Sequence, residues 1–288
     1  MTEPRTGGTP GPAPGAPVQD RQPAGRPPRP RLAAVAVALA VALIVLAIEL
    51  PPSTLLGKAD VAGYAVCHRL PERSFSLGDR PMPLCARCTG TFLGAVAGLG
   101  MMLLYGRRRA SRMPPAGILL VMVTFSALWA FDGLNSYMTF FPGAPHLYEP
   151  RNWLRLVTGL GNGVTLIILV LPILNFTLWR DPVSERVVKN GWEMLAIVAV
   201  AALVIPAVTS GIELLVYPLA LLSGAGVVMM LTLINGMMAT IILGREGYAR
   251  TWRDAAVPLI VGAGLAIVEM TGLVLVRAYL TMSIGLPF

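Results

Sequence analysis

The chain has 288 residues, of which 55% are hydrophobic and 13% charged, with a net charge of +8 and a mean hydropathy of +0.67. Soluble domains carry about 25% charged residues, so this composition excludes an ordinary soluble globular protein. Three cysteines are too few for a disulfide scaffold, and the basic residues lie between apolar segments instead of in one patch, which argues against nucleic-acid binding. The composition predicts a polytopic membrane protein.

The first segment of the chain has a composition of its own. Residues 1–31 contain nine prolines and five glycines, so we expect a disordered tail with too little apolar surface to offset its ordering entropy. An apolar run follows, from Leu32 to Leu50. A cleaved signal peptide would have an apolar region of about 7–15 residues followed by a small-residue cleavage site. This run is longer and ends in Glu49-Leu50-Pro51-Pro52, so we interpret it as an uncleaved first membrane span.

Six further apolar segments are long enough to cross a bilayer as helices, which takes about 20 residues. They lie at 85–106, 114–138, 152–178, 191–215, 218–244 and 254–280. Only Tyr217-Pro218 separates the fifth span from the sixth, and Pro206 could kink the fifth. The predicted fold is an all-α transmembrane bundle of about seven spans. We divide the chain into the tail (1–31), a part with the first spans and an outer Cys/His loop (32–165), and the remaining C-terminal spans (166–288).

Basic residues alternate between the loops, and this alternation predicts the orientation. The tail is basic, four arginines lie within 106–112, and basic residues follow the fourth and sixth spans at Arg180, Arg186, Lys189, Arg245, Arg250 and Arg253. Cytoplasmic loops are enriched in Lys and Arg. We therefore expect a multi-pass protein of the cell membrane with its N-terminus inside and its C-terminus outside. The segments 51–84, 139–151 and 216–217 would then be extracytoplasmic.

All cysteines and histidines fall on the predicted outer side. Cys67 and His68 lie in the first outer loop, Cys85 and Cys88 begin the second span, and His146 follows the third. A Cys-x-x-Cys pair at a helix N-terminus places both sulfurs on one face, where the helix dipole stabilises thiolates. This spacing suits a metal such as Zn²⁺ or a reversible disulfide.

Three interpretations of these residues remain open from the sequence. In the first, a structural zinc ion pins the outer loop to the second span, with ligands from Cys67, His68, Cys85 and Cys88; Asp132 or His146 could replace one of them. In the second, Cys85 and Cys88 cycle between thiols and a disulfide, with Cys67 as a third thiol, which an oxidising outer compartment allows. In the third, a plain structural disulfide leaves one thiol spare.

Polar residues at the outer ends of the third and fourth spans form a second candidate site. Asp132 lies near the outer end of the third span, and Asn152 and Arg155 share one stripe of the fourth. We expect the first outer loop to fold onto these ends and to bring its cysteine and histidine close to Asp132 and Arg155. These two residues could pair, or Arg155 could bind an anionic group of a substrate or lipid.

Two acidic residues lie within predicted spans. Glu269 is in the seventh span, and Glu213 is near the outer end of the fifth. A carboxylate inside the membrane is costly, so such residues are typical of a functional role. Glu269 could be a proton relay, an ion ligand or a partner of Arg277 or Arg155. A protonated or paired structural group is the alternative.

Glycines recur at helical spacing in the second span, at Gly90, Gly94 and Gly98. Small residues four apart let a neighbouring helix approach closely in lipid, so we expect helix–helix partners on this face. We interpret small residues of the last two spans in the same way: Gly224, Gly226, Gly262 and Gly264.

Several of these elements resemble one known family. They are Cys67-His68, Pro71-Glu72-Arg73-Ser74, Pro83-Leu84-Cys85-Ala86-Arg87-Cys88-Thr89-Gly90, Asp132-Gly133 and Asn152…Arg155…Thr158-Gly159. Together they resemble the predicted membrane proteins catalogued as domain of unknown function 2085, over residues of about 64–165. The resemblance implies which residues belong together, and it implies no reaction.

Three classes of function agree with these features. The first, which we favour, is a membrane protein whose outer metal site, with zinc as the expected ion, is structural and supports binding or transport. The second is a membrane enzyme, either a thiol oxidoreductase or a metal-assisted enzyme acting on a lipid or quinone-like substrate. The third is an assembly protein whose glycine faces bind partner helices. The lipid bilayer is the expected partner in all three, and nucleic acid is not.

Overall fold

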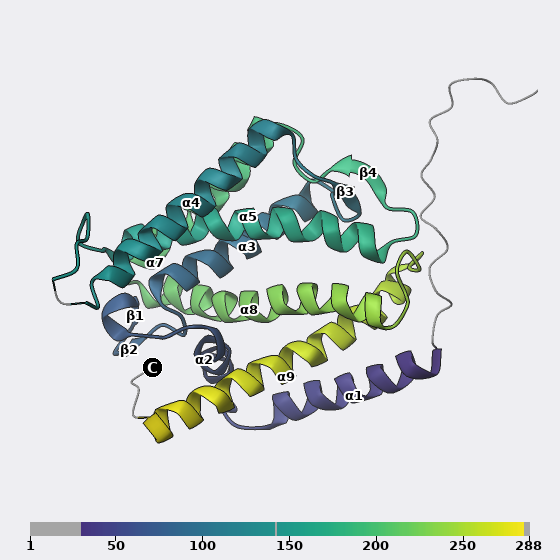
Figure 1. The fold of residues 1–288 in the computed structure, drawn as a ribbon, viewed down its shortest axis with the longest axis horizontal. Helices are drawn as coiled ribbons and strands as arrows, with labels where there is room; N and C mark the ends of the chain where they lie inside the picture. Colours follow the sequence, from purple (N-terminus) through teal and green to yellow (C-terminus); the bar gives the residue numbers. More distant parts are fainter. Residues whose placement is uncertain (1–29, 142, 285–288) are drawn as a thin grey trace, which may run out of the picture.

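The computed structural model describes residues 30–141 and 143–284, so the predicted disorder of 1–31 falls outside the described residues except for Pro30 and Arg31. Helices predominate (Figure 1). They are α1 (Pro30–Glu49), α2 (Leu55–Val66), α3 (Ala86–Leu104), α4 (Ala116–Met138), α5 (Asn152–Leu178), α6 (Gly191–Ala202), α7 (Val204–Thr209), α8 (Glu213–Ile242) and α9 (Trp252–Ile284). Two short strand pairs complete the fold: β1 (Ser76–Leu77) with β2 (Arg80–Pro81), antiparallel, and β3 (Ala110–Arg112) with β4 (Val183–Arg186), parallel.

Seven helical segments in the described part of the chain are long and apolar enough to cross a membrane. Six of them correspond to α1, α3, α4, α5, α8 and α9, and the seventh combines α6 and α7 as Gly191–Thr209. The prediction of an all-α bundle with seven spans is confirmed. The sequence did not predict α2, which has 12 residues and packs against α8, where Ala59 contacts Gly224.

Pro206 interrupts the fifth span, as expected. α6 ends at Ala202, and α7 begins at Val204. A proline ring inside a helix clashes with the carbonyl group four residues earlier, which here belongs to Ala202. The break between α6 and α7 therefore lies where this clash would occur.

The predicted division between the fifth and sixth spans at Tyr217-Pro218 is wrong. α7 ends at Thr209 and α8 begins at Glu213, so Pro218 lies inside α8. The chain turns at Gly211, whose φ of 68° is a left-handed conformation that glycine adopts without strain. Glu213 therefore begins the sixth span instead of lying near the end of the fifth.

α3 and α5 cross closely at the centre of the bundle (Figure 1). A Cβ atom on Gly90 or Gly94 of α3 would overlap the backbone of α5, and a Cβ atom on Gly163 of α5 would overlap Thr91 of α3. The expected close packing on the glycine face is confirmed, and the helix that packs there is α5 of the same chain. α5 is the most buried of the candidate spans.

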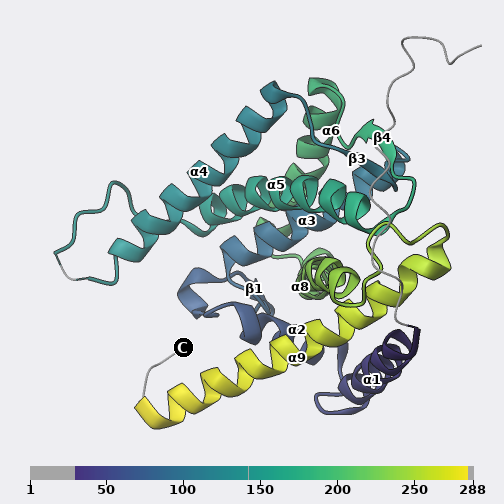
Figure 2. The ribbon, with the colours of Figure 1, turned by 45° about the vertical axis from the view of Figure 1, so that its right-hand side comes forward.

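The C-terminal helices form a second layer. Figure 2 shows α8 between the α3–α5 pair and α9, with α1 against α9. The four glycines expected to pack do so: their nearest neighbours across helices are Ala59 for Gly224, Phe92 for Gly226, Gly236 for Gly262 and Ala40 for Gly264. This layer connects α2 to the rest of the bundle.

The two ends of the bundle differ in character. The links after α3, α5 and α8 meet at one end, where β3 pairs with β4 and Arg107, 8% exposed, forms ion pairs with Glu185 and Glu193 (Figure 1). The opposite end carries α2, β1, β2 and the start of α3. The basic links and the cysteines thus lie at opposite ends, in agreement with the predicted topology. The N-in/C-out orientation itself stays a prediction.

Candidate metal centre and polar site

Three cysteines come together from two segments. Cys67 caps the C-terminus of α2, Cys85 is the N-cap of α3, and Cys88 lies in the first turn of α3. Their Sγ atoms all lie within 4.8 Å of one another, and each is a free thiol. The Cys85 backbone N–H donates a hydrogen bond to the Cys67 Sγ over 3.3 Å. This is the only group of three or more potential metal ligands found among the described residues.

The segment that carries Cys67 is held by an arginine of α9. The Arg277 guanidinium donates to the backbone carbonyls of Tyr64 (2.7 Å), Cys67 and His68 (3.0 Å), and it stacks 4.1 Å from the centre of the Tyr64 ring. A guanidinium has five N–H donors in one plane, so it can bind several carbonyls of a turn at once. Sequence reasoning considered Arg277 only as a partner of Glu269, because no sequence pattern marks backbone carbonyls as arginine partners.

The fourth expected ligand lies beside the cluster. His68 Nδ1 is 3.9 Å from the Cys67 Sγ, and His68 Nε2 is buried without a hydrogen-bond partner. The two residues considered as substitutes are engaged elsewhere: His146 Nε2 lies 3.0 Å from Glu149 on an exposed loop, and Asp132 pairs with Arg87. The described residues therefore bring together three of the four predicted ligands, with His68 adjacent.

The Cys67 thiol is the most acidic of the cluster outside the membrane spans. Hydrogen bonds from the thiols of Cys85 and Cys88 lower the pKa of Cys67 well below that of a free thiol. Cys67 therefore forms a thiolate more readily than a free cysteine. Thiolates are the form in which cysteine binds metals and reacts with disulfides.

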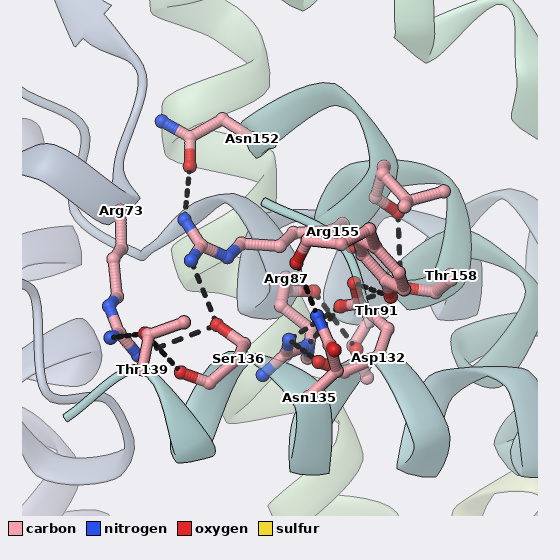
Figure 3. A network of polar contacts seen from close by, with 12 residues as sticks. Arg73, Arg87, Thr91, Asp132, Asn135, Ser136, Thr139, Asn152, Arg155 and Thr158 are labelled. Carbon is pink, nitrogen blue, oxygen red and sulfur yellow. Dashed lines mark hydrogen bonds and ion pairs between the residues drawn. The ribbon is translucent and has the colours of Figure 1, made fainter. Parts of the chain in front are cut away.

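A buried ion pair links the start of α3 to α4. Arg87, between the two cysteines of the Cys-x-x-Cys pair, donates to the Asp132 carboxylate and to the Asp132 backbone carbonyl (3.0 Å) (Figure 3). The Tyr148 hydroxyl donates to the same carboxylate over 2.8 Å. Burial and Asp132 raise the pKa of Tyr148 to about 12. The ion-pair partner of Asp132 is therefore Arg87, and not Arg155 as the sequence suggested.

Arg155 is bound to neutral groups. Its guanidinium donates to Asn152 Oδ1 (2.7 Å) and to Ser136 Oγ (2.8 Å) (Figure 3). The Asn152 amide donates in turn to the carbonyls of Glu72 and Ser74, both over 3.2 Å, and so holds the 71–74 turn onto α5. The loop between α2 and α3 therefore folds onto the ends of α4 and α5 that lie on its side of the bundle, as the sequence predicted.

Arg73 is a member of this network that sequence reasoning missed. The sequence gives Arg73 no predicted partner, yet its guanidinium donates to Thr139 Oγ1 (3.2 Å) and Ser136 Oγ (3.5 Å) (Figure 3) and stacks 3.7 Å from the Phe140 ring. The Pro-Glu-Arg-Ser element of the family resemblance was the signal that pointed to it.

Glu269 lies on another part of the bundle. It accepts a hydrogen bond from the Asn235 amide of α8 over 2.9 Å and is exposed on the surface of the bundle. Glu213, at the start of α8, lines a cleft with Arg80 and Leu77 of the β1–β2 hairpin. Neither acid belongs to the network around Ser136 drawn in Figure 3.

Comparison with known proteins places these residues in a family. Residues 67–169 match the family described as predicted membrane protein (DUF2085). An uncharacterized protein of Methanothermobacter thermautotrophicus is 35% identical over 104 residues, which cover 36% of this chain and 83% of that protein. The chain belongs to the DUF2085 family. The matched DUF2085 segment contains the three cysteines and the network around Ser136, and α6 to α9 lie outside it.

A second relative extends the comparison. An uncharacterized protein of Methanocaldococcus jannaschii is 29% identical over 108 residues, and the alignment covers 38% of this chain and 63% of that protein. This chain thus spans less than two thirds of that relative. No solved structure matches this DUF2085 protein.

Proposed function

We propose that Cys67, Cys85, Cys88 and His68 form a structural zinc site on the extracytoplasmic face of this membrane protein. The site would hold the first outer loop on the bundle and so support binding or transport at Asp132, Asn152 and Arg155, with Glu269 as a further polar group. The observation that carries the proposal is the grouping of three Sγ atoms, from two segments, within 4.8 Å of one another.

The donor set fits zinc. A tetrahedral zinc site with Zn–S bonds of about 2.3 Å holds its sulfurs about 3.8 Å apart, within the range of this cluster. The hydrogen bond from the Cys85 backbone N–H to the Cys67 Sγ resembles the hydrogen bonds that surrounding groups donate to metal-bound thiolates and that orient them. His68 Nε2, buried and without a hydrogen-bond partner, is a free fourth donor on the adjacent residue.

The site would stabilise the polar network through the loop that it anchors. Between Cys67 and Cys85 the chain forms the 71–74 turn, which contributes Arg73 and two carbonyl groups to the network. Fixing both ends of this loop with one ion would keep the turn on α5. Loss of the ion would therefore loosen the network as well as the cysteine cluster.

The positions of the basic links support an extracytoplasmic location. Lys and Arg mark cytoplasmic loops, and the links that carry them meet at the end of the bundle opposite α2 and the start of α3 (Figure 1), which carry the cysteines. With the basic end inside, the metal site faces outward.

Metal analysis tests the proposal. Full-length protein purified in detergent without chelator should contain about one zinc per chain, and Cys67→Ser, Cys85→Ser and Cys88→Ser should each lower the zinc content strongly. His68→Ala should weaken zinc retention against a competing chelator. His146→Ala is the matched control, since the chain has two histidines, and it should retain wild-type zinc. A protein that binds no zinc when refilled with the ion in reductant would contradict the proposal.

The alternative is a thiol-redox or metal-assisted membrane enzyme acting on a lipid or quinone-like substrate. An apolar cavity of about 150 Å³ between α4, α5 and α6 favours it, because Thr158 both lines this cavity and lies 3.5 Å from the Asp132 carboxylate. In a redox cycle two thiols would lose two electrons and two protons to a quinone, giving a disulfide and a quinol. A metal-free preparation in which Cys85 and Cys88 form and lose a disulfide reversibly would favour this alternative over the zinc site.

A further inference from the structure

The network around Ser136 holds more positive than negative charge. The network contains three guanidinium groups, of Arg73, Arg87 and Arg155, and one buried carboxylate, that of Asp132 (Figure 3). The Glu72 carboxylate, next to Arg73 in the chain, is exposed to solvent. The ion pair formed within this group joins Arg87 to Asp132. In the described ranges, Arg73 and Arg155 have hydroxyl and amide oxygens as hydrogen-bond acceptors and no carboxylate.

The burial of Arg155 makes this imbalance costly. Arg155 is 6% exposed, and its Nε is buried without a hydrogen-bond partner. A buried charge is normally paired with an opposite charge, because neutral hydrogen-bond acceptors compensate only part of the lost hydration. A bound anion would supply the missing charge.

The two unpaired guanidinium groups point at one position. Arg155 Nη2 lies 2.8 Å and Arg73 Nη1 lies 3.5 Å from the same Ser136 Oγ, and they come from different segments, α5 and the 71–74 turn (Figure 3). Asn152 and Thr139 flank them with further polar groups. Paired guanidinium groups with a neighbouring hydroxyl are the donors that recognise phosphate oxygens.

The position lies next to the exposed end of α4. Ser136 is buried, but Arg73 is half-buried and Thr139 at the end of α4 is exposed. An anion could therefore approach at the outer end of α4, beside the turn that carries Arg73.

We propose that Arg73 and Arg155 bind a phosphate-type oxyanion next to Ser136, either as a free ion or as the headgroup of an anionic lipid. This inference rests on the binding role proposed above for Arg155, and it does not require the metal. Because the 71–74 turn that carries Arg73 lies between Cys67 and Cys85 in the chain, the zinc content of every variant is measured alongside binding.

The test uses full-length protein and two probes. Protein in neutral detergent is titrated with inorganic phosphate by calorimetry. In parallel, protein is reconstituted into phosphatidylcholine bilayers with and without phosphatidylglycerol, and the phosphatidylglycerol retained after repurification is counted. Arg73→Gln and Arg155→Lys should each weaken binding by about tenfold or more, because each loses charge-assisted hydrogen bonds to the anion. Arg151→Gln is the matched control, since Arg151 is exposed at the start of α5, and it should leave binding unchanged.

The outcomes are distinct. Binding of inorganic phosphate that depends on both arginines supports the site with a free anion. Retention of phosphatidylglycerol alone, with the same dependence, supports it with a lipid headgroup. Binding of neither probe, or an equal loss in Arg151→Gln, overturns the inference. If Arg155→Lys fails to fold, Arg73→Gln on the partly exposed turn decides. Wild-type protein that binds the anion but binds no zinc when refilled would contradict only the metal site.

Discussion

Arg87 joins the two candidate sites at the level of single residues. It stands between Cys85 and Cys88, yet its guanidinium reaches α4 and pairs with Asp132 (Figure 3). The start of α3 therefore supplies two thiols of the cysteine cluster and the arginine of the buried ion pair.

The buried position of Asp132 predicts a large effect of its neutralisation. Asp132 is 1% exposed and accepts hydrogen bonds from Arg87 and Tyr148. Asp132→Asn should lower the free energy of unfolding by about 3–5 kcal/mol, because it leaves a largely buried guanidinium without its counter-charge. Denaturant titration in mixed micelles measures the change.

Asp60→Asn is the matched control for this variant. Asp60 also pairs with arginines, Arg69 and Arg80, but its side chain is 19% exposed, against 1% for Asp132, and those of its two partners are 22% and 44% exposed. Water screens such a pair, so we expect a loss of only about 1 kcal/mol. Equal losses in the two variants would mean that burial does not set the strength of the Arg87–Asp132 pair.

Sequence reasoning identified the thiols better than the arginines, for a physical reason. A Cys-x-x-Cys pair at a helix start has a fixed local geometry, so Cys85 and Cys88 can be placed together from spacing alone. Arg73 and Arg277 act through contacts with residues far away in the chain. Arginines near a membrane surface also look like topology signals or solvated residues, and their partners, hydroxyls and backbone carbonyls, have no distinctive pattern.

At the level of elements, apolar length predicted the spans and small residues predicted their packing. The errors arose where neither signal was decisive. α2 is too short to span and mixes Lys58 and Asp60 with apolar residues, so it resembled a loop. The division before α8 was assigned to Pro218, although the turn needs the left-handed conformation that Gly211 provides.

The close crossing of α3 and α5 predicts that Gly94 cannot be enlarged. A Cβ atom there would overlap the backbone of Leu160, and backbone cannot move aside as a flexible side chain can. Gly94→Ala should lower the free energy of unfolding by about 1–3 kcal/mol through overpacking. Denaturant titration in mixed micelles is again the measurement.

Gly100 in the same helix is the control. A Cβ atom on Gly100 would meet nothing within 4 Å, and the residue is exposed. Gly100→Ala should leave stability unchanged or raise it by up to about 1 kcal/mol, because alanine has the higher helix propensity. A neutral Gly94→Ala would show that the two helices can separate without cost.

At the scale of the whole molecule, the arginines of the basic end are structural as well as topological. Arg107 is bound by Glu185 and Glu193, and Arg109 stacks 3.8 Å from the Trp179 ring, so these side chains connect the links after α3 and α5. From the sequence, the arginines within 106–112 were used only to predict the orientation. Their partners are far away in the chain and lie next to them only because the links after α3 and α5 meet at one end of the bundle (Figure 1).

The separation of basic links and cysteines into opposite ends makes the orientation testable with two single cysteines. Leu147, 78% exposed, lies in the loop between α4 and α5 at the cysteine end, and Glu246 is exposed in the link after α8 at the basic end. With the N-terminus inside, a membrane-impermeant maleimide added to intact cells should label Leu147→Cys and spare Glu246→Cys. After lysis both should react.

The wild-type chain is the background control in this labelling, because its own cysteines lie in the cluster and two of them are buried. The opposite pattern, with Glu246→Cys labelled in intact cells and Leu147→Cys protected, would show that the protein has the opposite orientation in the membrane. The cysteine cluster would then face the reducing cytoplasm, where a thiol-bound metal persists but a stable disulfide does not. The orientation therefore determines whether the three thiols face an oxidising or a reducing compartment. A reducing compartment would argue against the redox alternative but would leave the zinc site possible.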